Sequence, residues 1–255
     1  MGNFSQPFLQ QDLIGNRKFP QQDRTRGFVF GHATGVNNTY KDLWEGPTAN
    51  YVFPTSGMQM AVVSTSASDA AAGIGLRTLH IHYLDTNYKT QEESITLNGT
   101  TPVNTVATNI YRINNMHAET VGSSGYAVGN VSLTNTGGTV TYGIIMAGDN
   151  SSHSAIYTVP AGVTGYISHW QASSGSTGNH FCQIEVLATC HDDVIWPGTF
   201  LTQDIQGTQN GGVSIEFPIP IPIPEKTDVK MRAISDAANA GVNALGAIMG
   251  WFETN

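Results

Sequence analysis

The stretch of sequence that decides the fold is Leu76–Val103, LRTLHIHYLDTNYKTQEESITLNGTTPV. Apolar and polar residues alternate through Thr78–Tyr83, a period of two that predicts a β-strand with one buried face. Asp85-Thr86-Asn87 supplies turn-forming side chains, and a second run, Thr90–Leu97, ends at Asn98-Gly99, a dipeptide favoured in tight hairpins. The stretch therefore predicts two strands joined by a turn, with a third strand after Asn98-Gly99.

Short alternating segments separated by turn residues recur along the rest of the chain, with no convincing long helix. Gly137-Gly138 and Pro160-Ala161-Gly162 predict two further hairpins. We expect further strands at Met60–Ser64, Asn109–Asn115, Gly129–Thr134, Thr139–Met146, Ala155–Val159, Thr164–Trp170, Phe181–Thr189, Phe200–Ile205, Val213–Phe217, Asp228–Ile234 and Leu245–Phe252. This spacing predicts an all-β protein, an antiparallel β-sandwich that is jelly-roll-like.

The first 60 residues differ from the rest, because Gln and Pro are frequent there and only Gly27–His32 has the character of a strand. We therefore expect an extended N-terminal arm or peripheral segment over residues 1–60 and one β-sandwich domain over residues 61–255. Two interpretations of the first segment stay open. It either wraps the domain or reaches a neighbouring subunit.

A proline at every second position distinguishes Pro218–Pro224, PIPIPIP. Proline removes a backbone N–H donor and favours an extended conformation. Such a run fits only the edge of a sheet, or an extended segment that is exposed to solvent or covered by a partner.

Composition excludes some classes of function. Only 12% of the 255 residues are charged, and the net charge is −8 with no Lys/Arg stripe, so we expect no binding to nucleic acid. The start of the chain lacks the pattern of a signal peptide, and no apolar run reaches the length of a membrane helix. We expect a soluble protein without membrane contact, cytoplasmic if cellular, whose low charge suits a surface covered by other subunits.

His80 and His82 are the first candidates for a metal site, since side chains two apart on a strand point the same way. His-x-His in a jelly roll resembles a cupin only in part. Cupins carry an acidic residue where Thr86-Asn87 stands, and a His shortly after Pro-x-Gly, where Val163-Thr164-Gly165 follows Pro160-Ala161-Gly162. Because two of the four ligands lack a candidate, we favour a polar face or an interface over a metal site.

A second cluster of ligand-type residues comprises Cys182, Cys190, His191, Asp192 and Asp193. It contains no Cys-x-x-Cys pair, and no partner cluster completes a tetrahedral site. A strand between the two cysteines would separate them by roughly 26 Å, too far for a disulfide, so we expect two free thiols.

No motif for catalysis is present. The chain has no Gly-x-Ser-x-Gly elbow and no nucleotide-binding glycine loop, and the neighbours Glu92 and Glu93 should face opposite ways on a strand. We expect no enzyme activity, no cofactor, and no catalytic, cofactor-binding or metal-binding residues. Four aromatic residues fit core packing or subunit contact better than a sugar-stacking platform; they are Tyr166, Trp170, Trp196 and Trp251.

Several segments together resemble a family of virion proteins of tailed bacteriophages, common in phages of marine and freshwater bacteria. They span roughly residues 76–234 and comprise Arg77-Thr78, Leu84–Tyr88, Glu93–Val103, Tyr111–Met116, Gly129–Val131, Ala155–Gly162, Thr164–Tyr166 and Phe217–Asp228. In that family the run before Glu225-Lys226-Thr227-Asp228 is usually less rich in proline, so the Ile-Pro repeat is a departure.

The resemblance implies a structural part of a virion, assembled in the host cytoplasm, and it brings no catalytic residues. The leading hypothesis is a capsid decoration (cement) protein, a homotrimer that contacts the major capsid protein or other virion proteins. A neck, tail or fibre component is the first alternative. An adhesin that binds host glycans through loops such as Ser173–Gly178 is the second, and a cupin-type metalloenzyme is the most remote.

Overall fold

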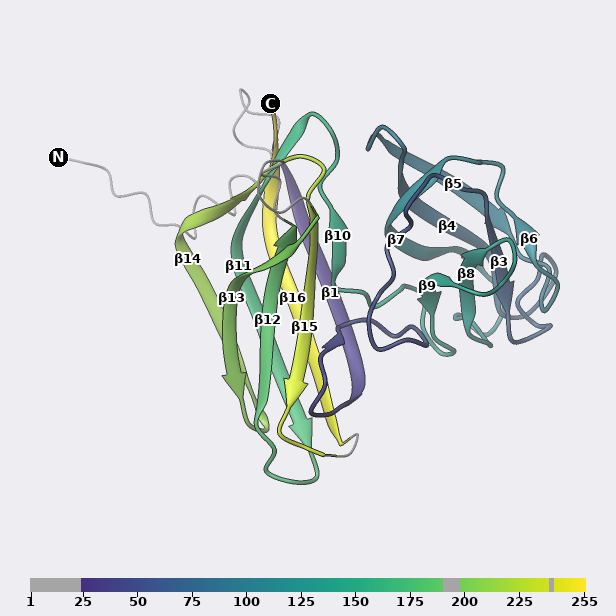
Figure 1. The fold of residues 1–255 in the computed structure, drawn as a ribbon. Helices are drawn as coiled ribbons and strands as arrows, with labels where there is room; N and C mark the ends of the chain where they lie inside the picture. Colours follow the sequence, from purple (N-terminus) through teal and green to yellow (C-terminus); the bar gives the residue numbers. More distant parts are fainter. Residues whose placement is uncertain (1–23, 190–197, 239–240) are drawn as a thin grey trace.

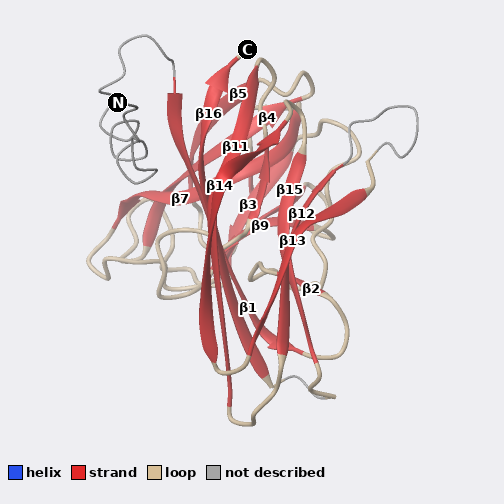
Figure 2. Ribbon diagram, turned by 90° about the vertical axis from the view of Figure 1, so that its left-hand side faces the viewer, coloured by secondary structure: helices blue, strands red, loops and turns tan. Residues whose placement is uncertain are grey.

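The computed structural model describes residues 24–189, 198–238 and 241–255, and this part consists of strands and turns without any helix (Figure 2). It therefore offers no helix with the length and hydropathy needed to cross a bilayer. The strands form two antiparallel β-sandwiches that lie side by side (Figure 1). The prediction of an all-β, antiparallel sandwich fold is confirmed.

The larger sandwich contains eight main strands of the described chain. They are β1 (Arg24–Val36), β10 (Ile156–Thr158), β11 (Val163–Ser176), β12 (Cys182–Thr189), β13 (Phe200–Thr208), β14 (Gly211–Ile223), β15 (Asp228–Ser235) and β16 (Val242–Thr254). The sheets are β1-β16-β11-β14 and β10-β15-β12-β13, and the short β2 (Lys41–Asp42) also pairs with β15. Renumbered 1 to 8 in chain order, the strands run 1-8-3-6 and 2-7-4-5. This order, with first strand beside last and second beside seventh, is that of a jelly roll.

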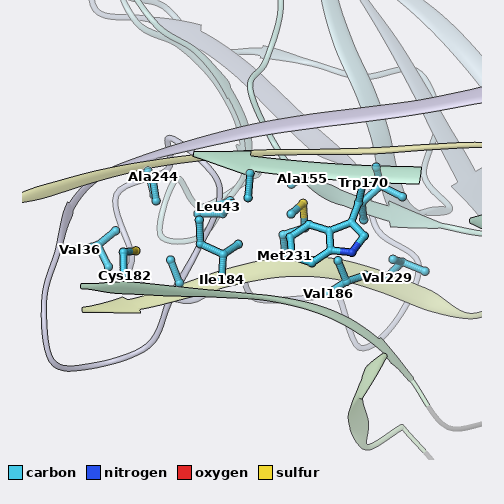
Figure 3. Packing of buried hydrophobic residues seen from close by; sticks show 14 of the residues in the cluster. Val36, Leu43, Ala155, Trp170, Cys182, Ile184, Val186, Val229, Met231 and Ala244 are labelled. Carbon is cyan, nitrogen blue, oxygen red and sulfur yellow. The ribbon is translucent and has the colours of Figure 1, made fainter. Parts of the chain in front are cut away.

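The core of the jelly roll lies between these two sheets, where buried side chains from both interdigitate (Figure 3). Trp170 from β11 and Met231 from β15 are fully buried there. Leu43 enters from the segment after β2, and its backbone bonds to both Met231 and Ala155. Gly31 on β1 makes room for that segment, because a Cβ atom there would lie only 2.2 Å from the Leu43 carbonyl oxygen.

The smaller sandwich is inserted between β2 and β10. Its strands are β3 (Met60–Ser64), β4 (Leu76–Asp85), β5 (Thr90–Thr96), β6 (Val103–Asn104), β7 (Ile110–Val121), β8 (Val131–Asn135) and β9 (Thr141–Ile145), in the sheets β6-β3-β8-β9 and β5-β4-β7. It has its own core, to which β4 contributes the predicted buried set Leu79, Ile81 and Tyr83. The alternation in Leu76–Val103 thus marks the inserted sandwich.

The chain is divided differently from the predicted arm over 1–60 and single sandwich over 61–255. Residues 24–36 form β1, which pairs with β16 along nearly its whole length, so this part of the expected arm is an edge strand of the jelly roll. Two separate hydrophobic cores then replace the single expected domain. Residues 1–23 lie outside the described residues, so the role of that segment stays a prediction.

Two of the predicted hairpins are wrong, while the one at Gly137-Gly138 is confirmed by the pairing of β8 with β9. After Asn98-Gly99 the chain enters β6, which pairs with β3 in the opposite sheet and not with β5. Pro160-Ala161-Gly162 likewise joins β10 to β11 across the jelly roll. Gly99 and Gly162 both have positive φ, 61° and 81°, so the glycine turns are real. They carry the chain between sheets, because the partners of each strand lie elsewhere in the sequence.

Buried polar contacts join the two sandwiches. Arg112 of β7 forms a bidentate ion pair with Asp228 of β15, with Nε to Oδ1 at 2.9 Å and Nη2 to Oδ2 at 3.1 Å. Beside it, the Asn114 side chain donates to the carbonyl of Thr158 and accepts from its N–H, each at 2.9 Å. Directional contacts of this kind fix the orientation of one sandwich against the other.

The Ile-Pro repeat forms the C-terminal half of β14, which is an edge strand of its sheet, as predicted. Ile221 and Ile223 face Ile167 and Gly165 of β11, and Pro222 faces Tyr166. A proline cannot donate to the ladder, so Ile221 and Ile223 are the residues of the repeat that can bond to β11. Residues 217–220 lie in a bulge at the register shift and have no partner on β11. Pro218, Pro220 and Pro222 thus offer no N–H group to a strand of another chain along this part of the edge strand.

Replacing Pro218, Pro220 and Pro222 together by threonine should restore these donors and make the edge competent for strand addition. We expect self-association that increases with concentration, measurable by sedimentation velocity. The matched control is Ile219→Thr, which changes an exposed residue of the same strand without adding an N–H. A triple variant with the sedimentation behaviour of this control would contradict the assignment.

Candidate functional site

Histidines gather on the outer face of the sheet β5-β4-β7. His80 and His82 leave β4 on the face opposite the buried Leu79 and Ile81. In the β4–β5 hairpin His82 stands opposite Glu92, and in the β4–β7 ladder His80 stands opposite His117. We call His80, His82, His117 and Glu92 the histidine cluster.

The side chains of the histidine cluster are in mutual contact. The Glu92 Oε2 atom lies 3.5 Å from His80 Nε2 and 3.9 Å from His82 Nδ1. The His117 ring packs against both other rings, with centroids 5.1 Å from His80 and 5.5 Å from His82. The other nitrogen of His80, Nδ1, is 3.0 Å from the hydroxyl of Ser94, which fixes the orientation of this ring.

Electrostatics keep part of the histidine cluster neutral. Burial lowers the pKa of His82, and the neighbouring His80 and His117 lower it further, although Glu92 raises it. Burial and His80 also lower the pKa of His117. Rings whose pKa lies below the usual value are unprotonated near neutral pH, which leaves nitrogen lone pairs free to accept a proton or bind a cation.

Two residues of this site were missed by the sequence analysis, which found no acidic partner and no third histidine for His80 and His82. Glu92 comes from the next strand and His117 from the third strand of the sheet. The ligand atoms of His80, His82 and Glu92 lie within 4.8 Å of one another, close enough to hold one metal ion. The expectation that Glu92 and Glu93 face opposite ways is confirmed, since Glu93 instead accepts from the N–H groups of Val106 and Ala107.

A cleft of about 450 Å³ lies between the two sandwiches beside the histidine cluster. His82 and Asn115 line it from the inserted sandwich, and Phe28 and Phe30 line it from β1. The connecting segment 151–154 completes the wall. Part of the outer face of the sheet β5-β4-β7 therefore lines a cleft whose walls contain both polar and apolar side chains.

A second group of histidines and carboxylates connects the two sandwiches. Glu45 accepts from His32 Nδ1 of β1 at 2.9 Å, and its other oxygen lies 3.3 Å from His153 Nδ1. An oxygen of Asp149 lies 4.0 Å from the same nitrogen of His153. The ring of Phe30 packs edge-on against the His153 ring, with the ring centroids 5.3 Å apart. The Glu45 Oε2 atom is buried and makes no hydrogen bond within the described part of the chain, so the bond from His32 is the one hydrogen bond that this carboxylate accepts there.

The remaining sequence candidates do not converge on a site. Trp170 is fully buried in the jelly-roll core, whereas Tyr166 and Trp251 stack at 5.4 Å as a cross-strand pair on β11 and β16, so these three residues form no common platform. Cys182 is a buried free thiol, and burial raises its pKa to about 11. The other residues named in the sequence analysis, Cys190, His191, Asp192, Asp193 and Trp196, lie outside the described residues.

Comparison with known proteins assigns this chain to no family. No protein-family model and no curated protein match the sequence. A structure of infectious bursal disease virus, Gt strain, is 10% identical over 98% of this chain and 87% of that chain, with a TM-score of 0.18. The crystal structure of the VP2 subviral particle of the same virus is 12% identical over 98% and 82%, with a TM-score of 0.17. The similarity to these virus-particle structures is weak, and TM-scores this low support no functional argument.

Proposed function

We propose that this protein is a structural component of a virus particle, and within that class a decoration (cement) protein of a tailed-phage capsid. The observation that carries the proposal is the strand order 1-8-3-6 and 2-7-4-5, with a second sandwich inserted between the first two main strands. Jelly rolls are the folds of many viral capsid domains, although lectins and cupins share them. The resemblance of residues 76–234 to virion proteins of tailed phages favours the first of these classes.

The surface of the jelly roll supports a role in protein–protein contact. The edge strands β13 and β14 lie on the side of the jelly roll away from the inserted sandwich (Figure 1). Leu201, Ile205 and Ile219 are exposed there to 41%, 44% and 84%. Exposed apolar residues grouped at one side of a protein with few charges favour burial against other subunits. We infer that this side meets the major capsid protein or further copies of the chain, with a homotrimer as the expected assembly.

The copy number in purified particles tests the proposal, measured by quantitative mass spectrometry against the major capsid protein. A decoration protein should be present at on the order of hundreds of copies, as lattice symmetry requires. A few to a few dozen copies would instead indicate a neck, tail or fibre component, or an adhesin. Absence from the particle would overturn the proposal altogether.

A charge placed on the apolar side should weaken incorporation. We expect Ile219→Glu to reduce the number of copies bound to particles by about tenfold or more, because a buried unpaired carboxylate costs well over 1.4 kcal/mol. The matched control is Val106→Glu, which adds the same charge at a residue of the inserted sandwich that is 88% exposed. Equal loss in both variants would show that the β13–β14 side is not the contact.

A further inference from the structure

We propose that His80, His82 and Glu92 form a binding site for a divalent transition-metal ion, Zn²⁺ in particular, with His117 as a positioning residue. The site does not depend on the proposed virion function. It would tie together the three strands of the sheet β5-β4-β7, because two ligands come from β4, the third from β5, and the supporting ring from β7.

The placement of the ligands follows from β-sheet geometry. His80 and His82 are two residues apart on β4, so both side chains leave the same face. Glu92 stands directly opposite His82 on β5, where the Cβ atoms of paired residues lie about 4.5–5.5 Å apart. Three ligand side chains thus converge from rigid strands without help from a loop.

The distances suit a small ion. Zn²⁺ binds nitrogen and carboxylate oxygen at about 2.0–2.2 Å, so tetrahedral ligands lie roughly 3.3–3.5 Å from one another. The Glu92 Oε2 atom is 3.5 Å from His80 Nε2 and 3.9 Å from His82 Nδ1. A small rotation of the Glu92 side chain, which is exposed, would shorten the 3.9 Å distance to His82.

Neighbouring groups prepare the ligands. The Ser94 hydroxyl is 3.0 Å from His80 Nδ1, which leaves Nε2 of that ring as the atom directed toward Glu92. A hydrogen-bond partner on the nitrogen that does not bind the metal fixes the tautomer and the orientation of a metal-binding histidine. The His117 ring packs tilted or stacked against both other rings, which restricts their rotation.

The chemistry of the ligand set selects the class of ion. Two imidazoles and one carboxylate favour Zn²⁺ and related transition metals, whereas Mg²⁺ and Ca²⁺ require oxygen ligands. Three protein ligands leave the fourth tetrahedral position for water. The other group with suitable atoms is Glu45, Asp149 and His153. It offers one imidazole where the histidine cluster offers two, so the metal is assigned to the histidine cluster.

Isothermal titration calorimetry of the full chain with ZnCl₂ tests the site. We expect one Zn²⁺ per chain at this site and no comparable heat with MgCl₂. Loss of a residue that hydrogen-bonds a metal ligand typically lowers metal affinity about 10–100-fold, so Ser94→Ala should lower it about tenfold. His80→Ala/His82→Ala removes two ligands and should lower the affinity about 100-fold or more. Zn²⁺ should also raise the Tm of the wild type by roughly 5 °C or more at saturation, and not that of the double variant.

Controls separate this site from other histidines. His169→Ala removes a histidine of the jelly roll that lies 3.8 Å from Glu216, and it should leave Zn²⁺ binding unchanged. Cys190→Ala/His191→Ala removes two ligand-type residues outside the described part of the chain, and it should also leave Zn²⁺ binding unchanged.

The role of His117 has its own test. His117→Phe preserves a ring and should keep most of the affinity, whereas His117→Ala should lower it about tenfold. Co²⁺ bound in place of Zn²⁺ should give the visible absorption of a four-coordinate nitrogen and oxygen site in the wild type and in His117→Phe, and not in His80→Ala/His82→Ala. Zn²⁺ binding that survives in the folded His80→Ala/His82→Ala variant, or no binding by the wild type, would overturn the proposal.

Discussion

Replacing Arg112 by alanine should lower the free energy of unfolding by about 3–5 kcal/mol, since it leaves the Asp228 carboxylate buried without its partner. The guanidinium group and the carboxylate are only 8% and 12% exposed and make two parallel hydrogen bonds. Arg112 also donates to the Pro54 carbonyl at 2.8 Å and lies over the Tyr111 ring at 4.0 Å. Arg112→Ala therefore removes the ion pair, this further hydrogen bond and the ring contact together.

The effect of Arg112→Ala should extend to cooperativity. Each sandwich has its own core, so the contacts between them decide whether both unfold together. We expect scanning calorimetry to show one transition for the wild type and two for the variant. In the double variant Arg112→Met/Asp228→Leu no buried charge is left unpaired, so it should be more stable than Arg112→Ala. A single transition at the wild-type Tm in Arg112→Ala would show that other contacts dominate.

Local features of the fold could be predicted from the sequence. The alternation in Leu76–Asp85 correctly places Leu79 and Ile81 in a core and His80 and His82 on the outer face. The final strand expected at Leu245–Phe252 is also present, within the longer β16 (Val242–Thr254). Both predictions depend only on neighbouring residues, for which a period of two is sufficient.

The division into two sandwiches could not be predicted, because it depends on contacts between distant residues. Phe28 of β1 pairs with Met249 of β16 at the opposite end of the chain, and no periodicity reports which strands are partners. The inserted sandwich has the same strand-and-turn composition as the jelly roll, so its boundaries leave no mark in the sequence. The turns at Asn98-Gly99 and Pro160-Ala161-Gly162 were correctly found, but their sequences are the same whether a hairpin or a crossing between sheets follows.

The histidine cluster was predictable in part. A hairpin centred on Asn87 places His82, five residues before it, opposite Glu92, five residues after it, so the carboxylate could have been found from the register. His117 could not, because the β4–β7 ladder joins distant segments and is interrupted by several register shifts. The cupin pattern places its acidic residue shortly after the second histidine, whereas the carboxylate beside His82 comes from the neighbouring strand β5.

The largest effect within one core is expected for Trp170→Ala, which should lower the free energy of unfolding of the jelly roll by about 3–5 kcal/mol. The Trp170 side chain is fully buried between the two sheets and meets Met231 and Val186 in the same core (Figure 3). Its indole N–H donates to Asp204 Oδ2 of β13 at 2.9 Å, so it also connects the edge strand β13 to the opposite sheet. Denaturant unfolding followed by circular dichroism measures the loss.

Two controls divide this effect into its causes. Trp170→Phe keeps most of the volume but removes the donor to Asp204, so it should cost about 1–2 kcal/mol. Trp251→Ala removes the same type of side chain from the neighbouring strand β16, where the ring is only half-buried and stacks on Tyr166. Loss of one such aromatic pair should cost about 1 kcal/mol. If Trp170→Ala cost no more than Trp251→Ala, the two sheets of the jelly roll would not share the tightly packed core described above.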